Sequence, residues 1–283
     1  MEKIIDGRII SKELRRNLGK EILKIEEELS KRPKLKVVVV GDNSSAISYI
    51  KGVISMSKLT RIDVELEEYP IETTEEQFLD NVELLNKDNS VNGVLIMTPL
   101  PDHISVLKVF NRLDPIKDVD GLTPFNVGNF FKYEECHMAA TPKGVDNIIE
   151  YLGLDIKGMN VCVIGASIVV GRPMAEHLLR RDATVSICHK ETRDLTMYTK
   201  QADIVVSCAG VPNLVTADMV KDDVIILDVG VNFVDGKMCG DCDFDGILEK
   251  ARYITPVPGG VGPMTIAQIY TQTFNAFKKM NNL

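Results

Sequence analysis

Short apolar runs alternate along the chain with longer segments whose apolar positions recur every three to four residues. Residues 35–40 ("LKVVVV"), 62–70 and 91–101 predict three strands, and the segments between and after them, 45–59, 73–88 and 105–115, predict helices. The helix at 73–88 opens with a Thr/Glu capping pattern. Apolar strands separated by helices favour a parallel sheet that is covered on both faces.

A second alternating unit follows a segment without clean periodicity, residues 113–142, which the sequence predicts to be loop and inter-domain crossing. A helix is expected from about residue 143, then strands at 160–165, 183–188, 202–210 and 223–230, and an amphipathic C-terminal helix at 262–280 that is long enough to pack on the first lobe. The fold class predicted is α/β, with two lobes around a cleft. One domain comprises residues 1–142 plus 264–283, and the other 143–263.

Composition narrows the class of protein. The chain has 283 residues, of which 45% are hydrophobic and 26% charged, as in soluble globular proteins. Its net charge is −8 and no basic cluster stands out, which argues against a nucleic-acid partner. No apolar run approaches the roughly 20 residues that span a bilayer, and the N-terminus "MEKIIDGRII" lacks a signal pattern. We therefore expect a cytoplasmic protein with no membrane contact.

The cysteines fit that expectation. Cys162, Cys188 and Cys208 lie in strand-like apolar runs, where cysteine acts as a small hydrophobe. Cys239 and Cys242 form a single C-x-x-C, "CGDC", which is compatible with a redox pair or half a zinc site. No second Cys or His pair stands nearby, so we predict no metal.

A strand, a glycine turn and a helix come together in "VCVIGASIVVGRPMAEHLL". Gly165, Ser167 and Gly171 give the pattern G-x-S-x-x-x-G, which is longer than G-x-G-x-x-G. The context is that of a dinucleotide phosphate site, although a plain turn without a ligand remains the alternative. Glu191 follows Gly171 by 20 residues, where an acid can bind ribose hydroxyls. The run "SCAG" after the third strand would let an adenine or nicotinamide lie close to the backbone.

Two loops also carry candidate chemistry. The run "ITPVPGGVGPMT" (254–265) holds prolines and glycines that exclude helix and central strand, so it is either a rigid turn or a loop that a ligand approaches closely. The run "KDVDG" (117–121) is either a solvated acidic turn or a source of a carboxylate that grips an amidine-like edge by paired hydrogen bonds.

These motifs, together with "PLP", "TPKG" and "DVG", occur in the order found in the methylenetetrahydrofolate dehydrogenase/cyclohydrolase proteins, and the chain resembles that family over nearly its whole length. The resemblance implies a folate-binding catalytic domain (1–142 plus 264–283) and a Rossmann-like dinucleotide-binding domain (143–263), usually in a homodimer. Such enzymes oxidise 5,10-methylenetetrahydrofolate with a nicotinamide cofactor, and most also hydrolyse the methenyl product to 10-formyltetrahydrofolate.

The resemblance also implies residue roles. Tyr49 would stack on the folate and Asp120 would hold the pterin edge, and these two are the catalytic candidates. The substrate-binding candidates are Tyr49, Val53, Met97, Pro99, Asp120, Pro258, Gly259, Gly260 and Gly262. The cofactor-binding candidates are Gly165, Ala166, Ser167, Val169, Gly171, Lys190, Glu191, Cys208, Ala209 and Gly210.

The departures from the family pattern bear on mechanism. Val53 and Met97 stand where the family has a lysine and a glutamine that act in the hydrolytic step, and neither apolar side chain can move a proton. We therefore expect a monofunctional dehydrogenase. The alternatives are a bifunctional enzyme in which Lys51 or Lys58 substitutes, and an inactive folate-binding paralogue.

A second group of departures concerns the cofactor. Ala166 replaces an arginine of many NADP-using members, and Glu191 would repel a 2′-phosphate, whereas Lys190 argues the other way. The sequence predicts NAD as the preferred cofactor, with NADP as the alternative.

Overall fold

Two parallel sheets form where the apolar runs predict strands. This computed structural model describes residues 3–41 and 44–283, with side chains from 3 to 41 and from Tyr49 onward. The chain divides into two units, one of residues 1–11 with 141–265 (unit 1) and one of residues 12–140 with 266–283 (unit 2). The two-domain α/β fold class is confirmed, and unit 1 is the Rossmann-like one.

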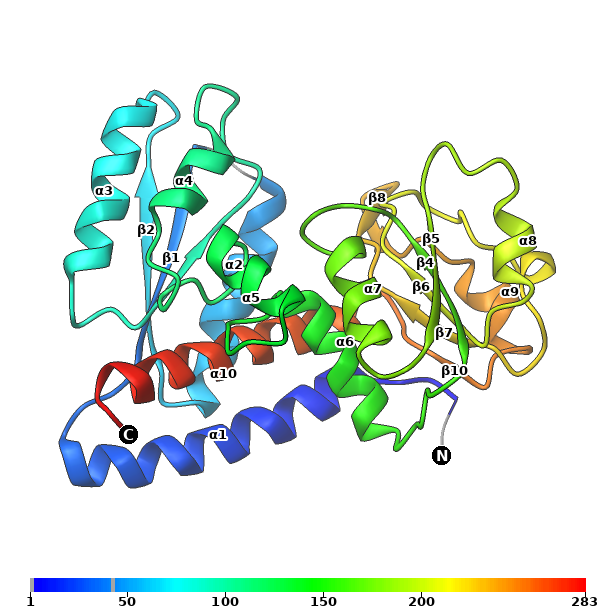
Figure 1. Ribbon diagram of the computed structural model, residues 1–283, viewed down its shortest axis with the longest axis horizontal. Coiled ribbons are helices and arrows are strands. Elements are labelled where there is room, and N and C mark those ends of the chain that lie inside the picture. The colour runs from blue at the N-terminus through cyan, green and yellow to red at the C-terminus, as the bar shows by residue number, and fades with distance from the viewer. Residues whose placement is uncertain (1–2, 42–43) are drawn as a thin grey trace. The chain divides into compact units, whose positions relative to one another are not determined.

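The sheet of unit 2 has β1 (Lys34–Val40) between β2 (Asp63–Tyr69) and β3 (Gly93–Ile96), and all three strands are parallel. Alternate side chains of β1 enter two separate cores, as the period of two requires. α3 (Glu75–Lys87) and α4 (Val106–Arg112) cover one face of the sheet (Figure 1). The other face packs against α1 (Gly7–Leu29), α2 (Ser44–Met56) and α10 (Val261–Met280). The C-terminal helix therefore packs on the first lobe, as its length predicts.

The sheet of unit 1 runs in the order β10-β7-β6-β4-β5, again parallel. Its strands are β4 (Asn160–Ile164), β5 (Thr184–Cys188), β6 (Ile204–Ser207), β7 (Ile225–Asp228) and β10 (Tyr253–Ile254). The direction of winding reverses between β4 and β6, which makes the carboxyl ends of these two strands the expected ligand position.

Helices cover both faces of this second sheet. α6 (Ala140–Tyr151) and α7 (Gly171–Leu179) pack on one face, and α8 (Leu195–Thr199) and α9 (Phe244–Leu248) on the other. A small antiparallel hairpin, β8 (Asn232–Val234) and β9 (Lys237–Cys239), follows β7. Two single 3₁₀ turns, η1 (Ser57–Leu59) and η2 (Ala217–Met219), complete the elements.

The segment predicted as loop, 113–142, contains α5 (Pro124–Phe131). Thr123 caps this helix by accepting from the Asn126 N–H, and Pro124 occupies its first turn, so local start signals outweigh the absence of a period. The capping box of α3 also differs from prediction, because Thr74 pairs with Gln77 rather than with a glutamate. β3 ends at Ile96, so Met97 lies outside the strand.

Within the described residues, no helix is both long enough and apolar enough to cross a membrane.

Gly19 offers a test of how tightly α1 is packed. A Cβ on Gly19 would lie 2.2 Å from the carbonyl oxygen of Leu59, a backbone atom, whereas a Cβ on Gly128 in α5 would meet no atom within 4 Å. We predict that Gly19→Ala lowers the free energy of unfolding by about 1–3 kcal/mol despite alanine's better helix propensity. Gly128→Ala should raise it by up to about 1 kcal/mol. Urea unfolding of both variants checks this, and equal effects of the two would contradict it.

Candidate active site

The folate-side candidates of unit 2 share one apolar cluster. Tyr49 is half-buried on α2, while Val53, one turn later, is fully buried and Met97 nearly so. Burial, and then the charge of Asp120, raise the pKa of the Tyr49 phenol, so it stays neutral and can donate a hydrogen bond. On the α2 side, the candidate site therefore consists of the Tyr49 ring packed on the apolar side chains of Val53 and Met97.

Tyr270 is a member of this cluster that the sequence did not single out. Its side chain is completely buried on α10, and its hydroxyl donates to the backbone carbonyl of Val53. It fixes the turn of α2 that carries Tyr49. The sequence shows Tyr270 only as one of the apolar positions of a periodic helix. That pattern does not distinguish a tyrosine with a specific hydrogen bond from any other core residue.

Lys51 and Lys58, the two lysines considered as substitutes, are both exposed. Lys51 lies two residues from Tyr49, or about 200° around the helix. Lys51 therefore points away from the face of α2 that carries Tyr49 and Val53, into solvent. Pro99, in the turn after β3, is also exposed.

The segment "KDVDG" is anchored at both ends, beginning with Lys117. This lysine is 2% exposed, and its Nζ donates to three backbone carbonyls at the end of α3, those of Leu85 (2.7 Å), Asn86 (2.8 Å) and Asp88 (2.7 Å). These are carbonyls that a helix leaves without intrahelical partners. The lysine of the motif is thus an anchor that holds the loop against α3.

Asp118 anchors the same loop to α5. Its Oδ2 accepts from the Thr123 backbone N–H (2.6 Å) and from Asn126 Nδ2 (2.9 Å), and the residue is fully buried. The backbone carbonyl of Val119 accepts from Gln272 Nε2 of α10 (2.5 Å). A loop held at each of these residues can present Asp120 in a fixed position.

Asp120 differs from its neighbours in how its charge is balanced. It retains partial exposure, and its pKa is raised to about 7, first by burial and then by the charge of Asp118, while an N–H of Ala140 acts in the opposite direction. A partly exposed carboxyl whose pKa is raised in this way, and whose charge acts on the Tyr49 phenol, is a candidate functional group rather than a solvated loop acid.

The glycine turn of unit 1 connects β4 to α7 and packs against the residue that follows β6, at the winding reversal. Gly165 follows β4 with φ +120°, and a Cβ there would lie 2.6 Å from the carbonyl oxygen of Cys208, which follows β6. A Cβ on Gly171 would lie 1.9 Å from the Gly165 carbonyl oxygen. Both positions require glycine, for close packing of the turn and of α7.

The side chain of Ser167 shapes the rest of this turn. Its Oγ accepts from the backbone N–H groups of Val170 (3.1 Å) and Gly171 (3.4 Å), and Arg172 Nε donates to the Ala166 carbonyl (3.1 Å). Ser167 itself is exposed. A pre-formed, glycine-lined cradle at the start of a helix fits the pyrophosphate of a dinucleotide.

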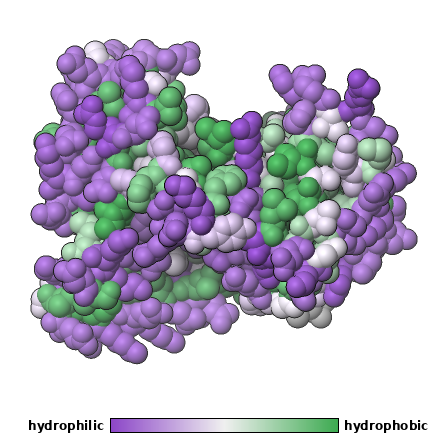
Figure 2. All heavy atoms as spheres, viewed as in Figure 1, coloured by the Kyte–Doolittle hydropathy of each residue, from purple (hydrophilic) through white to green (hydrophobic). Residues whose placement is uncertain are grey.

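Exposed apolar side chains gather in the loops after the central strands of unit 1. Ile168 follows β4, Val211 follows β6, and Val231 and Phe233 follow β7, and all four are exposed. Figure 2 shows apolar side chains on the viewed face of this unit. Such side chains at the ends of parallel strands are suited to contact flat rings.

Lys190 and Glu191 lie beyond the end of β5, the strand beside β4. Both are exposed, with Lys190 Nζ 4.0 Å from Glu191 Oε1. The Glu191 N–H donates to His189 Nδ1 (3.2 Å). In a doubly wound sheet this is where an acid meets the adenosine ribose.

The proline-glycine loop belongs to unit 1, with the cofactor candidates, whereas Tyr49 and Asp120 belong to unit 2. Gly259 has φ +113°, and the Gly260 N–H donates to the Pro256 carbonyl (2.7 Å). A Cβ on Gly7 would lie 1.8 Å from the Gly260 carbonyl oxygen, so the loop packs against the first residue of α1. Pro258 and Gly262 are exposed.

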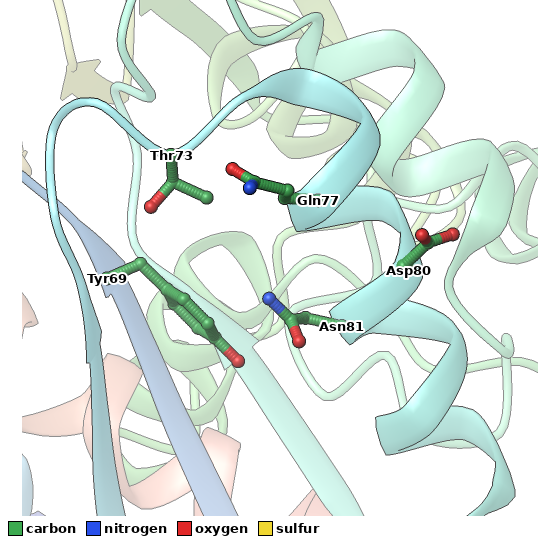
Figure 3. Close-up of a pocket in the computed structure, with 5 residues that line it drawn as sticks. All are labelled: Tyr69, Thr73, Gln77, Asp80 and Asn81. Carbon is green, nitrogen blue, oxygen red and sulfur yellow. The ribbon is translucent and has the colours of Figure 1, made fainter.

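Other features contribute no candidate residue. Among the described residues no group of three or more His, Cys, Asp and Glu side chains could hold a metal, and Cys242 of the C-x-x-C is buried. A hollow of about 360 Å³ beside α3 is lined by polar side chains and Tyr69, with Asp80 pointing away from the others (Figure 3). None of the sequence-predicted residues lines it.

Two family descriptions match most of the chain. Residues 5–120 match "Tetrahydrofolate dehydrogenase/cyclohydrolase, catalytic domain", and residues 139–281 match the NAD(P)-binding domain of the same family. The chain belongs to the tetrahydrofolate dehydrogenase/cyclohydrolase family. The family resemblance drawn from the motifs is thereby confirmed.

Individual relatives cover the chain from end to end. The bifunctional protein FolD of Hydrogenobaculum sp. (strain Y04AAS1) is 41% identical over 278 residues, which cover 98% of this chain and 99% of that protein. The bifunctional FolD methylenetetrahydrofolate dehydrogenase/cyclohydrolase of Campylobacter jejuni has a TM-score of 0.95 at 39% identity, over 99% of both chains. The FolD of Trypanosoma brucei, complexed with NADP and an inhibitor, has a TM-score of 0.95 at 30% identity, over 99% and 98%.

The raised pKa of Asp120 makes a stability prediction. A carboxyl whose pKa is about 7 in the folded state and near 4 when unfolded favours folding when protonated, so its contribution is lost as pH rises from about 4 through 7. Asp120→Asn cannot ionise and should raise Tm at pH 8, with the gain vanishing near pH 4. Thermal unfolding of both proteins across this range checks it. A lower Tm of the variant at pH 8 would show that the carboxylate stabilises the fold instead.

Proposed function

We propose that this chain is a methylenetetrahydrofolate dehydrogenase that oxidises 5,10-methylenetetrahydrofolate to 5,10-methenyltetrahydrofolate with a nicotinamide cofactor, working as a homodimer. The observation that carries the proposal is the presence in one chain of two features: Tyr49 with the charge of Asp120 acting on it in unit 2, and a closely packed glycine turn in unit 1. An inactive paralogue has no chemical need for a partly exposed carboxyl whose pKa is raised to about 7.

The residues of the chain bind and orient in this scheme. Asp120, when ionised, accepts hydrogen bonds from the amidine-like edge of the pterin, and Tyr49 stacks on the folate and can donate its O–H. Gly165, Ser167 and Gly171 hold the pyrophosphate. The nicotinamide, when bound, supplies the hydride chemistry. The protein's task is to align the methylene carbon with it, which needs no general base.

The cofactor preference follows from exposed charges. We propose NAD, because Ala166 offers no guanidinium to a 2′-phosphate and Glu191 would repel it, although the NADP bound by the Trypanosoma brucei relative supports the alternative. The positive charge of Lys190 would attract a 2′-phosphate, but Glu191 lies beside it and its negative charge offsets part of that attraction.

We predict a higher kcat/KM with NAD than with NADP when methenyltetrahydrofolate formation is followed by absorbance. Glu191→Ala should improve NADP use by up to about fivefold, the range for one exposed charge pair, and Lys190→Ala should weaken it. A preference for NADP in the wild type contradicts the cofactor assignment. Absence of product with both cofactors contradicts the dehydrogenase proposal itself.

Hydrolysis of the methenyl product is the second candidate activity. The relatives above are named bifunctional, which favours this alternative over the monofunctional enzyme expected from the sequence, and the monofunctional reading is not confirmed. Against it stand Val53 and Met97, two apolar side chains in the buried cluster beside Tyr49. Neither can transfer a proton to or from water.

From those two side chains we predict slow hydrolysis by the wild type, and Val53→Lys with Met97→Gln should speed it by about tenfold or more, within the range of one proton-transfer group. Each single variant should do less, and Val53→Lys should lower Tm because the site is fully buried.

Lys51→Ala is the matched control and should change neither the hydrolysis rate nor Tm, since Lys51 is exposed. Decay of methenyltetrahydrofolate against its uncatalysed background measures this. Fast wild-type decay that disappears in Lys51→Ala would overturn it.

A further inference from the structure

We propose that Asp241 is a positioning residue for the cofactor, which holds the segment 207–211 after β6 in the shape that the cofactor's rings lie against. The inference rests on the proposed function, because it assumes that this segment borders a nicotinamide dinucleotide. Asp241 itself is completely buried and would not touch the cofactor.

Three successive backbone N–H groups converge on the Asp241 carboxylate. Those of Ala209 (2.7 Å) and Gly210 (3.2 Å) donate to Oδ2, and that of Val211 (3.0 Å) donates to Oδ1. Consecutive amides point to one side of a chain only when the chain curls around an acceptor. The carboxylate therefore determines the curvature of the segment.

Two side chains complete the shell around the same carboxylate. Ser207 Oγ donates to Oδ2 (2.9 Å) from the last residue of β6, and Asn232 Nδ2 donates to Oδ1 (2.9 Å) from the first residue of β8. Asp241 thus links the loops that follow two neighbouring strands of the sheet. All five donors are satisfied only if both carboxylate oxygens of Asp241 accept hydrogen bonds. An asparagine at this position would present one oxygen and one NH₂ group, which is a donor.

The space for this arrangement comes from reciprocal pairs of aspartate and glycine. A Cβ on Gly230 would lie 2.0 Å from Asp241 Oδ1, and a Cβ on Gly240 would lie 2.0 Å from Asp228 Oδ2. Asp228 Oδ1 in turn accepts from the Asp241 N–H (3.1 Å) and the Gly230 N–H (3.0 Å). The motifs "DVG" (228–230) and "CGDC" (239–242) therefore pack against each other. In the second motif, Gly240 and Asp241 make these contacts.

The position of the segment gives this framework a functional consequence. Cys208 lies against Gly165 at the winding reversal, where a Cβ on Gly165 would be 2.6 Å from the Cys208 carbonyl oxygen. A change in the curvature of 207–211 would move the wall opposite the glycine turn. Cofactor binding should therefore respond to Asp241 more strongly than folate binding does.

The experiment compares Asp241→Asn with Asp146→Asn. Asp146 is a matched control, since it is also a buried aspartate of unit 1, and its carboxylate forms ion pairs with Lys143 and Arg181 instead of accepting from segment 207–211. Two further variants keep Asp241 and test the proposal if Asp241→Asn does not fold. Gly230→Ala crowds Asp241 Oδ1, and Ser207→Ala removes one donor to Oδ2. NADH binding is followed by fluorescence titration, with KM for methylenetetrahydrofolate and Tm measured alongside.

We expect Asp241→Asn to raise the Kd for NADH at least tenfold and to change the folate KM less than threefold. Gly230→Ala should act in the same direction, and Ser207→Ala less strongly. Asp146→Asn should lower Tm and leave the NADH Kd unchanged. An unaltered NADH Kd in folded Asp241→Asn or Gly230→Ala overturns the inference, as does an equal loss of NADH and folate binding in all variants. If the wild type binds neither NADH nor NADPH, the proposed function fails first and the inference with it.

Discussion

Buried carboxylates that accept backbone N–H groups hold the functional loops of both units. A loop after a parallel strand leaves the ladder and must find new partners for its amides, since an unpaired buried N–H costs about as much as a lost hydrogen bond. Asp241 supplies both oxygens to the loop after β6, and Asp118 supplies one to the start of α5. Removing a carboxylate from water is costly unless such donors surround it, so loop and acid stabilise each other. The shape of each loop is consequently fixed before any ligand arrives.

Asp120 shows what happens to an acid with fewer donors in the same surroundings. Its pKa is raised to about 7, because the Ala140 N–H only partly offsets burial and the nearby charge of Asp118. Asp228 is intermediate between Asp241 and Asp120 in the number of donors that its carboxylate accepts from. It accepts three N–H groups, yet burial and the Asp241 charge still raise its pKa to about 6. The acid with the fewest donors is the one that keeps partial exposure, so its carboxyl can accept further hydrogen bonds.

The sequence predicted the elements whose signals are local and periodic. The strand runs, the glycine turn and the C-terminal helix appear near the expected positions, although β3 ends at Ile96, five residues before the predicted end of its strand. It did not predict α1, whose apolar positions are interrupted by charges, or α5, whose start depends on Thr123 and Pro124 rather than on a period. The anchoring roles of Lys117 and Asp241 were also out of reach, because their partners are backbone groups of distant segments. A sequence motif shows which residues are present, but it does not show which backbone carbonyls or amides their side chains bind.

The same reasoning applies to Val53 and Met97, where the motif resemblance implies that the family has a lysine and a glutamine. Both side chains lie in one apolar cluster with Tyr49, beneath the hydroxyl of Tyr270 that is bonded to the Val53 carbonyl. In such a cluster a lone lysine or a lone glutamine would be a buried polar group without its partner, which costs more than either the intact pair or two apolar residues. Replacement of one member therefore favours replacement of the other. Two apolar residues leave no unpaired polar group in the cluster, and they leave in place the ring of Tyr49 and the carboxyl of Asp120, the two groups proposed to position the folate.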